Sequence, residues 1–351
     1  MEKIELHTKS RPSTVFCGGG ALDLAAEYLA GKDAILVTDS NVCRLYAPLL
    51  KEKFPAAHIF AFPAGERHKT RSTLFSVLDA MFERGLHRTS FVAALGGGVV
   101  GDLAGLAAAL YMRGTRLVQI PTTLLAQVDS SVGGKTAIDY RGVKNAVGAF
   151  YQPERVFCDP LFLQTLPARE IRCGLGEIVK TGVLSALIGE KIRRNADKLH
   201  DLGFLQTLAA DCIRFKAGVV EQDETEKSGL RKCLNLGHTT GHALELLCGR
   251  RSHGEYVLIG MWLETFIAEG EGVCSHEYAE EVRALVRLAE KRIPAFPNAQ
   301  KGLEFALLDK KNAGQGSVSV ILSKAPGEYA EVILPADRYA KYLALLQGGA
   351  Q

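Results

Sequence analysis

The stretch Phe91-Val-Ala-Ala-Leu-Gly-Gly-Gly-Val-Val-Gly-Asp102 decides the fold class of this chain. Its first five residues are apolar throughout, which predicts a strand that is buried on both faces. The glycines lead into a helix predicted over 102–112, and a further helix is predicted over 71–84. Similar apolar runs at 34–38 and 116–120 repeat the strand. The first half is therefore predicted to be an α/β domain with a mostly parallel sheet and helices on both faces.

The second half has a different pattern. From about 161 to 292 the apolar residues follow a helical period, and β-rich runs nearly vanish. Strands are predicted only at 317–323 and 329–334, joined by a hairpin at Pro326-Gly327, and a last helix is predicted over 336–346. The composition changes near 153–167. We therefore predict an α/β domain over 1–160, a mainly α-helical domain over 161–351, and an active-site cleft between them.

Composition excludes several classes of protein. The 351 residues carry 42 basic and 39 acidic side chains, a formal charge of +3, which argues against nucleic-acid and membrane-surface partners. No run approaches the roughly 20 apolar residues of a membrane span, and the first residues lack the apolar core of a signal peptide. Eight cysteines without a Cys-x-x-Cys pair are typical of a reducing compartment, so a cytoplasmic protein is expected.

Three polar segments follow the predicted strands, at the edge where α/β sheets bind ligands. The glycine-rich turn at 96–102 suits a dinucleotide pyrophosphate, and close packing of helix on strand explains it as well. Asp39 ends the first predicted strand, where an acidic residue holds a ribose hydroxyl and favours NAD over NADP; a helix cap is the alternative. The segment 65–69 is either a second nucleotide contact or a solvated helix start.

The stretch Pro121-Thr-Thr-Leu-Leu-Ala-Gln-Val-Asp-Ser-Ser-Val-Gly-Gly-Lys135 is denser in polar groups. Arg113 precedes it, and Lys144 and Asn145 follow it. A cleft that receives lysine, arginine and asparagine together suits a phosphate or carboxylate substrate. A solvated basic surface is the alternative for any one of these residues.

Asn235-Leu-Gly-His-Thr-Thr-Gly-His-Ala-Leu-Glu245 places His238 and His242 on one face of a predicted helix, and His253 follows eleven residues later. Two stacked imidazoles can reach one metal ion or be ordinary helix histidines. Glu177 and Lys180 are either a salt bridge one turn apart or, for Glu177, the oxygen ligand of a site. Two histidines and one glutamate with an open position are typical of catalytic zinc.

These motifs together resemble the 3-dehydroquinate synthases, a family of sugar phosphate cyclases. The resemblance rests on residues 96–102, 121–135, 176–180, 234–242 and 252–255, and it extends from about 39 to 312. It implies a Rossmann-like N-terminal domain that holds NAD and a mainly helical C-terminal domain that holds zinc or cobalt. It also implies a homodimer that acts on a small sugar phosphate in the shikimate pathway.

The resemblance assigns a role to each matching position. The implied metal ligands are Glu177, His238 and His253, while His242 becomes a proton-handling group. The implied NAD-binding residues are Asp39, Asn41, Glu66, Lys69, Gly97, Gly98, Val99, Asp102, Thr122, Thr123, Asp129, Ser130, Lys135, Lys144, Phe162 and Thr165. The implied substrate-binding and catalytic residues are Arg113, Lys135, Asn145, Lys180, Lys216, Arg231, Asn235 and Lys310 or Lys311.

The implied reaction converts 3-deoxy-D-arabino-heptulosonate 7-phosphate to 3-dehydroquinate and phosphate. NAD takes a hydride from the C5 hydroxyl, phosphate leaves, the hydride returns, and an internal aldol reaction closes the carbocycle. Three features depart from the commonest family pattern: Asp139, Tyr256 and one inserted residue near Lys227. They leave room for a related cyclase acting on an amino analogue. The sequence also leaves open a metal-dependent polyol dehydrogenase and a non-catalytic metal-binding or nucleotide-binding module.

Overall fold

The computed structural model describes residues 1–308 and 316–347. The chain divides into two compact units: residues 1–166 with 205–227, and residues 167–204 with 228–351. The second segment of the first unit is most of helix α7 (Leu202–Gln222), which the sequence pattern assigns to the helical half. Among the described residues, none of the helices combines the length and the apolar character that crossing a membrane requires.

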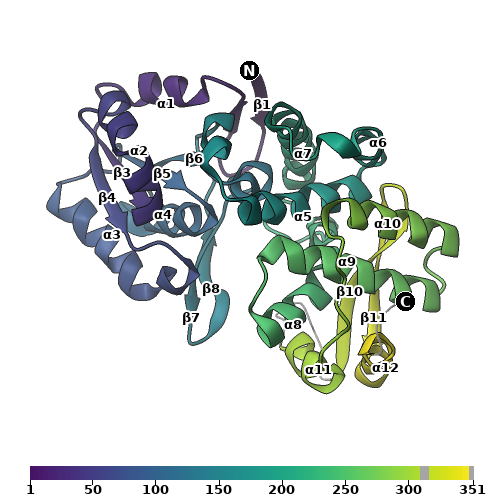
Figure 1. Ribbon diagram of the computed structural model, residues 1–351. Helices are drawn as coiled ribbons and strands as arrows, with labels where there is room; N and C mark the ends of the chain where they lie inside the picture. The colour runs from purple at the N-terminus through teal and green to yellow at the C-terminus, as the bar shows by residue number, and fades with distance from the viewer. Residues whose placement is uncertain (309–315, 348–351) are drawn as a thin grey trace. The chain divides into compact units, whose positions relative to one another are not determined.

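The first unit is built on a seven-stranded sheet with the order β1-β2-β9-β6-β5-β3-β4. Its strands β3, β4, β5 and β6 are labelled in Figure 1. All neighbouring strands are parallel except β1 and β2. The strands are β1 (Glu2–Leu6), β2 (Ser13–Cys17), β3 (Ala34–Asp39), β4 (His58–Phe62), β5 (Phe91–Gly96), β6 (Arg116–Pro121) and β9 (Arg155–Cys158). The three strands predicted from apolar runs are β3, β5 and β6, and their residues are almost all buried, as a central parallel strand requires.

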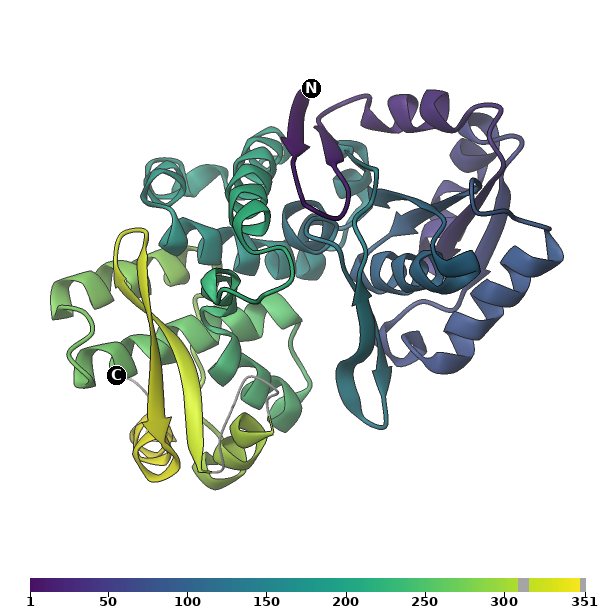
Figure 2. The same ribbon diagram turned by 180° about the vertical axis from the view of Figure 1, so that it is seen from behind.

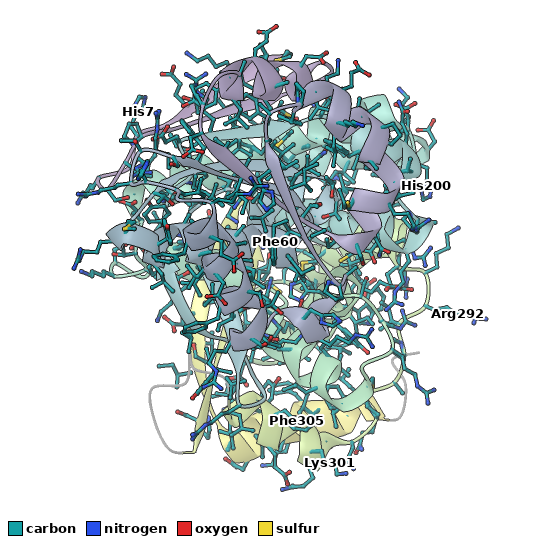
Figure 3. The ribbon with its side chains drawn as sticks, turned by 90° about the vertical axis from the view of Figure 1, so that its left-hand side faces the viewer. His7, Phe60, His200, Arg292, Lys301 and Phe305 are labelled. Carbon is teal, nitrogen blue, oxygen red and sulfur yellow. The ribbon has the colours of Figure 1, made fainter. Side chains whose placement is uncertain are left out.

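Helices cover both faces of this sheet, which confirms the predicted α/β class. They are α1 (Ala21–Leu29), α2 (Ser40–Lys53), α3 (Arg71–Glu83) and α4 (Gly98–Leu110). Alternate residues of the central strands point to opposite faces. Ile35 and Val37 pack with α3 and α4, whereas Leu36 packs with α1 and α2. Phe60 of β4, labelled in Figure 3, packs at the margin of the α3–α4 core.

The structure corrects several sequence predictions in this unit. Helix α4 begins at Gly98, directly after the strand, so the glycine-rich segment forms the first turn of the helix instead of a loop before it. The strands β1, β2, β4 and β9 were missed because each is only four or five residues long, too short for its pattern of apolar residues to be recognised. The hairpin β7 (Lys135–Tyr140) and β8 (Val143–Phe150) was missed because β8 is exposed on both faces.

The second unit is mainly helical, as predicted. Its elements are α5 (Ala168–Leu184), α6 (Ala186–Arg194), α8 (His238–Cys248), α9 (His253–Gly270), α10 (His276–Ala289), α11 (Ala299–Leu307), β10 (Ser317–Ala325), β11 (Glu328–Pro335) and α12 (Ala336–Gln347). The predicted hairpin is present as the antiparallel pair β10–β11, drawn in yellow and yellow-green in Figure 2. Gly327 at its turn has φ +79°, a conformation that favours glycine. Helix α9 is buried along almost its whole length and contacts α5, α8 and α10.

Candidate active site

Three imidazole rings converge in the second unit. His238 and His242 lie one turn apart at the start of α8, and His253 is the first residue of α9. The ring centroid of His238 lies 5.2 Å from those of both other histidines, and those of His242 and His253 are 5.6 Å apart. One ring nitrogen from each histidine lies within 4.8 Å of the other two. The three rings can therefore share one metal ion.

Glu177 of α5 reaches the same place. Its Oε1 lies 3.6 Å from Nε2 of His238 and 3.6 Å from Nε2 of His253, and its side chain is only 1% exposed. These separations are too long for hydrogen bonds. The donor atoms of a tetrahedral zinc site, with bonds of about 2.1 Å, lie about 3.4 Å apart. The carboxylate and two imidazoles thus have the spacing and chemistry of a metal site, and either Glu177 or His242 can supply the third ligand.

Glycines set the distance between the helices that carry these residues. Each of the three residues has a glycine as chain neighbour: Gly176 precedes Glu177, Gly237 precedes His238, and Gly254 follows His253. A Cβ on Gly176 would lie 2.6 Å from the carbonyl carbon of Gly254, and one on Gly237 would lie 2.6 Å from the carbonyl oxygen of Val257. The backbone of α9 is therefore in contact with α5 and with the start of α8 at the positions that carry the proposed ligand side chains.

Replacing Gly254 by alanine is expected to lower the free energy of unfolding by about 3 kcal/mol, because the new Cβ overpacks a backbone contact. That Cβ would lie 2.7 Å from the carbonyl carbon of Cys173. The control is Gly218→Ala in α7, where a Cβ would meet no atom within 4 Å. Since alanine favours a helix over glycine, this variant is expected to gain about 0.5–1 kcal/mol. Urea unfolding of both variants tests the close-packing argument, and equal effects would contradict it.

The charges of the cluster shift its pKa values when no metal is bound. Burial by itself raises the pKa of Glu177, but the neighbouring Lys180 and His253 outweigh burial and lower that pKa to about 2. Burial by itself lowers the pKa of His253, but the carboxylates of Glu177 and Glu245 outweigh it and raise that pKa to about 9. A metal ion must therefore displace a proton from His253 at neutral pH.

Metal affinity is expected to increase with pH for this reason. Glu177 is ionised throughout the working range, so His253 supplies the proton that competes with the metal. Loss of one proton on binding predicts an apparent Kd that falls about tenfold per pH unit up to about pH 9. Titration of the metal-free protein with Co²⁺ at about pH 6.5, 7.5 and 8.5, all below the pKa of His253, measures this slope. A pH-independent Kd would show that His253 is not a ligand.

Cations and an amide predicted to bind substrate gather near the histidines. Lys180 lies one turn after Glu177, forms an ion pair with it, and donates a hydrogen bond to the carbonyl oxygen of Leu234 at 2.9 Å. Leu234 belongs to the short 3-10 helix Leu230–Asn235, which also carries Arg231 and Asn235. Lys180 is 2% exposed and Arg231 is 1% exposed. The salt bridge considered for Lys180 from its spacing is therefore present.

In the first unit, several predicted nucleotide contacts lie at the carboxyl edge of the parallel strands. The amide and carboxylate side chains of Asn145 and Asp102 accept hydrogen bonds from Nζ of Lys69, each at 2.5 Å. Lys69 is 4% exposed. Burial raises the pKa of Asp102 more than Lys69 lowers it. Lys216 of α7 donates at 2.7 Å to both the carbonyl oxygen and Oδ1 of Asp129.

The glycine-rich turn packs closely against neighbouring segments, and Asp39 caps a helix. A Cβ on Gly97 would lie 3.0 Å from the Thr123 methyl group, and one on Gly98 would lie 3.2 Å from Oγ of Ser130. A Cβ on Gly101 would lie 2.9 Å from the side-chain oxygen of Gln119 on β6, so the close packing of helix on strand is confirmed, and the pyrophosphate interpretation stays a prediction. Asp39 Oδ1 accepts from the backbone N–H groups of Asn41 and Val42 at 2.8 and 3.0 Å. The helix-cap interpretation of Asp39 is confirmed as well.

The remaining predicted nucleotide contacts differ in exposure. Thr122 is buried, and its backbone N–H donates to the carbonyl oxygen of Gly96 at 2.9 Å. Phe162 is a core residue, 1% exposed, with its ring 5.0 Å from that of Tyr46, whose hydroxyl lies 2.5 Å from Oγ1 of Thr165. Val99 packs at the margin of the α3–α4 core. Glu66 and Lys144 are exposed.

Two further predicted substrate cations, Arg113 and Lys135, belong to the first unit. Arg113 is exposed and precedes β6, whereas Thr122 and Thr123 follow it. A strand of this length separates the two edges of the sheet by about 20 Å. Lys135 forms an ion pair with Glu226, and both side chains are partly exposed. Lys310 and Lys311 lie outside the described residues.

The departures from the family pattern have local structural partners. Asp139 Oδ1 accepts from the backbone N–H of Asn145 at 2.8 Å within the hairpin β7–β8. The hydroxyl of Tyr256 accepts from the backbone N–H groups of Arg250 and Arg251 at 3.0 and 3.3 Å, which closes the loop between α8 and α9. The backbone N–H of Lys227, at the insertion, donates to Oδ1 of Asp223 at 2.8 Å.

Sequence reasoning missed two carboxylates beside the histidines. Oε2 of Glu245 lies 3.5 Å from Nδ1 of His253. Glu264 accepts hydrogen bonds from the first turn of α8. The spacing of Glu245, one turn after His242 on the same helix, was a signal for its position. Glu264 had no such signal, because it lies on a different helix and its contact depends on how α8 and α9 pack.

Known proteins are similar to this chain in sequence and in fold. Residues 59–173 match the family model described as 3-dehydroquinate synthase N-terminal, and residues 174–312 match the one described as 3-dehydroquinate synthase C-terminal. The chain is 44% identical to 3-dehydroquinate synthase of Pelobacter propionicus over 321 residues, which cover 88% of each chain. It is 39% identical to the enzyme of that name from Alkaliphilus metalliredigens, over 98% of each chain.

A solved structure of 2-deoxy-scyllo-inosose synthase, complexed with carbaglucose-6-phosphate, NAD+ and Co2+, is also similar. It has a TM-score of 0.88 and 26% identity, and the match covers 99% of this chain and 100% of that one. The 2-epi-5-epi-valiolone synthase ValA of Streptomyces hygroscopicus, with NAD+ and Zn2+ bound, has a TM-score of 0.84 at 26% identity over 99% and 98% of the two chains. The chain belongs to the 3-dehydroquinate synthase family of carbocycle-forming enzymes.

Proposed function

We propose that this chain converts 3-deoxy-D-arabino-heptulosonate 7-phosphate to 3-dehydroquinate and phosphate, with NAD as a catalytic cofactor and zinc or cobalt as the metal. The family makes the chain a phosphate-eliminating lyase that forms a carbocycle. The observation that carries the proposal is the cluster of Glu177, His238, His242 and His253 beside the buried Lys180. This cluster offers a metal site together with groups that can bind and protonate a substrate.

We assign the metal to Glu177, His238 and His253, a set that suits zinc and cobalt equally. A metal held there polarises and acidifies a substrate hydroxyl. His242 lies beside these ligands without being needed for them, so it is the group that holds or moves a proton on the substrate. Glu245 orients His253 through Nδ1 and keeps Nε2 directed toward Glu177.

Lys180, Arg231 and Asn235 are the substrate-binding groups of the second unit. Lys180 and Arg231 are cations, Asn235 offers an amide, and these groups suit a substrate that carries both a phosphate and a carboxylate. We infer that Lys69, Asp102 and Asp129 belong to the NAD site, since they lie in one unit after parallel strands. The match to the 3-dehydroquinate synthase family over most of the chain favours this reaction over that of a polyol dehydrogenase.

A phosphate-release assay tests the proposal. The metal-loaded enzyme is incubated with the heptulosonate phosphate and with NAD far below the substrate concentration. We expect phosphate release to go to completion without a net increase in NADH absorbance, because NAD is regenerated in each cycle. NADH formed in proportion to product would identify a dehydrogenase instead. An amino analogue of the substrate, assayed in parallel and turned over faster, would identify a related cyclase.

The departures at Asp139, Tyr256 and Lys227 are compatible with the heptulosonate phosphate as substrate. Each has a structural partner of its own: a hairpin, a loop between helices, and the turn after α7. None therefore requires a different substrate to explain it. The homodimer and the cytoplasmic location stay predictions, and light scattering of the purified enzyme measures the first of them.

A further inference from the structure

Helix α8, which presents His238 and His242, begins without a capping side chain of its own. Its N-cap residue is Gly237, with φ +76°. A Cβ at this position would lie 2.6 Å from the carbonyl oxygen of Val257 and 3.0 Å from the backbone nitrogen of Met261. The close contact with α9 therefore excludes the serine, threonine or aspartate that normally caps a helix. The first N–H groups of α8 need a partner from elsewhere.

Glu264 of α9 is that partner. Its Oε2 accepts from the backbone N–H of Gly237 at 2.8 Å, and its Oε1 accepts from that of Thr240 at 3.1 Å. These are the N-cap and N3 groups, which a capping box would satisfy with two side chains of the helix itself. The carboxylate is 2% exposed, and its charge lies at the positive end of the helix dipole. One residue of α9 thus replaces both halves of a capping box.

The residue held between these two hydrogen bonds is His238. Its Nδ1 lies 3.1 Å from the carbonyl oxygen of Leu236, so Nδ1 carries the hydrogen and donates it. This leaves Nε2 as the ligand atom, directed toward Oε1 of Glu177. The orientation of the ring depends on the backbone from Leu236 to Thr240, to which Glu264 bonds on both sides of His238.

We propose that Glu264 is a positioning residue, which holds His238 in the orientation required to bind the catalytic metal. The inference rests on the proposed function, because it presumes that a metal binds at His238. Replacing a buried residue that orients a metal ligand without touching the metal typically lowers metal affinity by about 10- to 100-fold.

Other contacts keep α8 in place without Glu264. The Thr240 and Tyr339 hydroxyls are 3.0 Å apart, and Thr239 Oγ1 donates to the carbonyl oxygen of Ser319 at 3.1 Å. These two bonds attach α8 to α12 and β10 through residues that follow His238. Loss of Glu264 is therefore expected to loosen the first turn while the rest of the helix keeps its packing.

The test is a titration of metal-free protein with Co²⁺, whose visible absorption reports the ligand geometry. Glu264→Ala removes both hydrogen bonds, and Glu264→Gln keeps one, since the amide has a single acceptor oxygen. We expect the Kd for Co²⁺ to rise about 10- to 100-fold for alanine and by less for glutamine, with altered absorption in both. The control is Glu269→Gln on the same helix. The Glu269 carboxylate binds Arg283 and His276, which are not part of the proposed metal site.

The outcomes separate this inference from the proposed function. Wild-type protein that binds no Co²⁺ would overturn both. Wild-type binding together with an unchanged Kd and spectrum in the Glu264 variants would overturn the inference alone. If Glu264→Ala does not fold, Glu264→Gln decides the question. A Kd that rises equally in Glu269→Gln would show that the effect is general destabilisation and would also overturn it.

Discussion

Replacing Glu177 by glutamine is expected to lower turnover by about 10³-fold or more and to remove most of the bound metal. The amide keeps the shape of the side chain but loses the charge that a divalent ion needs, and each 1.36 kcal/mol of lost stabilisation is tenfold in rate. The change also leaves Lys180 buried without its carboxylate partner. Breaking a buried ion pair in this way typically costs about 3–5 kcal/mol of stability.

Metal analysis, turnover and urea unfolding measure the three effects separately. The matched control is Glu190→Gln on α6, where the carboxylate pairs with two arginines and is 44% exposed. An exposed pair contributes little, so this variant should unfold at almost the same urea concentration as wild type and keep its metal. Full metal content in Glu177→Gln would show that the three histidines hold the ion by themselves.

Alanine substitutions of His238 and His242 are expected to differ although the two residues lie one turn apart. His238→Ala removes a ligand, so the protein should lose its metal and, with it, almost all activity. His242→Ala should bind metal within a few-fold of wild type but turn over about 10²- to 10⁴-fold more slowly, because a proton-transfer group is missing. This difference follows from the proposed ligand set, in which Glu177, with its Oε1 3.6 Å from Nε2 of both His238 and His253, supplies the third ligand in place of His242.

Each variant of this pair is the control for the other, because both remove an imidazole from the same helix face. Co²⁺ titration measures the affinity, and phosphate release at saturating metal measures the rate. Equal loss of metal in both variants would instead assign the ion to the three histidines, whose ring nitrogens all lie within 4.8 Å of one another.

Much of the fold was predictable from local patterns. The apolar runs form the central strands β3, β5 and β6. These strands are buried on both faces, so nearly all of their residues are apolar, and this pattern is visible in the sequence. The hairpin β10–β11 was indicated by two β-rich runs around Pro326-Gly327. The exposed strand β8 and the short edge strands β1 and β4 lack such an apolar run, because they bury few side chains.

The site was predictable in part. Spacing alone placed His238 and His242 on one face of a helix. The resemblance to the family predicted that Glu177 and His253 bind the same metal as His238. Spacing did not reveal that Arg113 lies at the opposite edge of the sheet from Thr122, or that Lys135 pairs with Glu226. The glycines of the 96–102 segment suggested a nucleotide, and the structure shows that Cβ atoms on Gly97 and Gly98 would lie 3.0 Å from Thr123 and 3.2 Å from Ser130.

The sequence by itself determined the central strands β3, β5 and β6, the hairpin β10–β11, which residues can bind a metal, and which family the motifs resemble. These properties follow from short-range preferences and from the order of residue types along the chain. Only the tertiary structure decided which of these residues meet. Glu177 approaches His238 and His253 because three helices touch at glycines, and Glu264 caps α8 because that contact excludes a side chain at Gly237. Such contacts depend on backbone packing between distant segments, which no local pattern encodes.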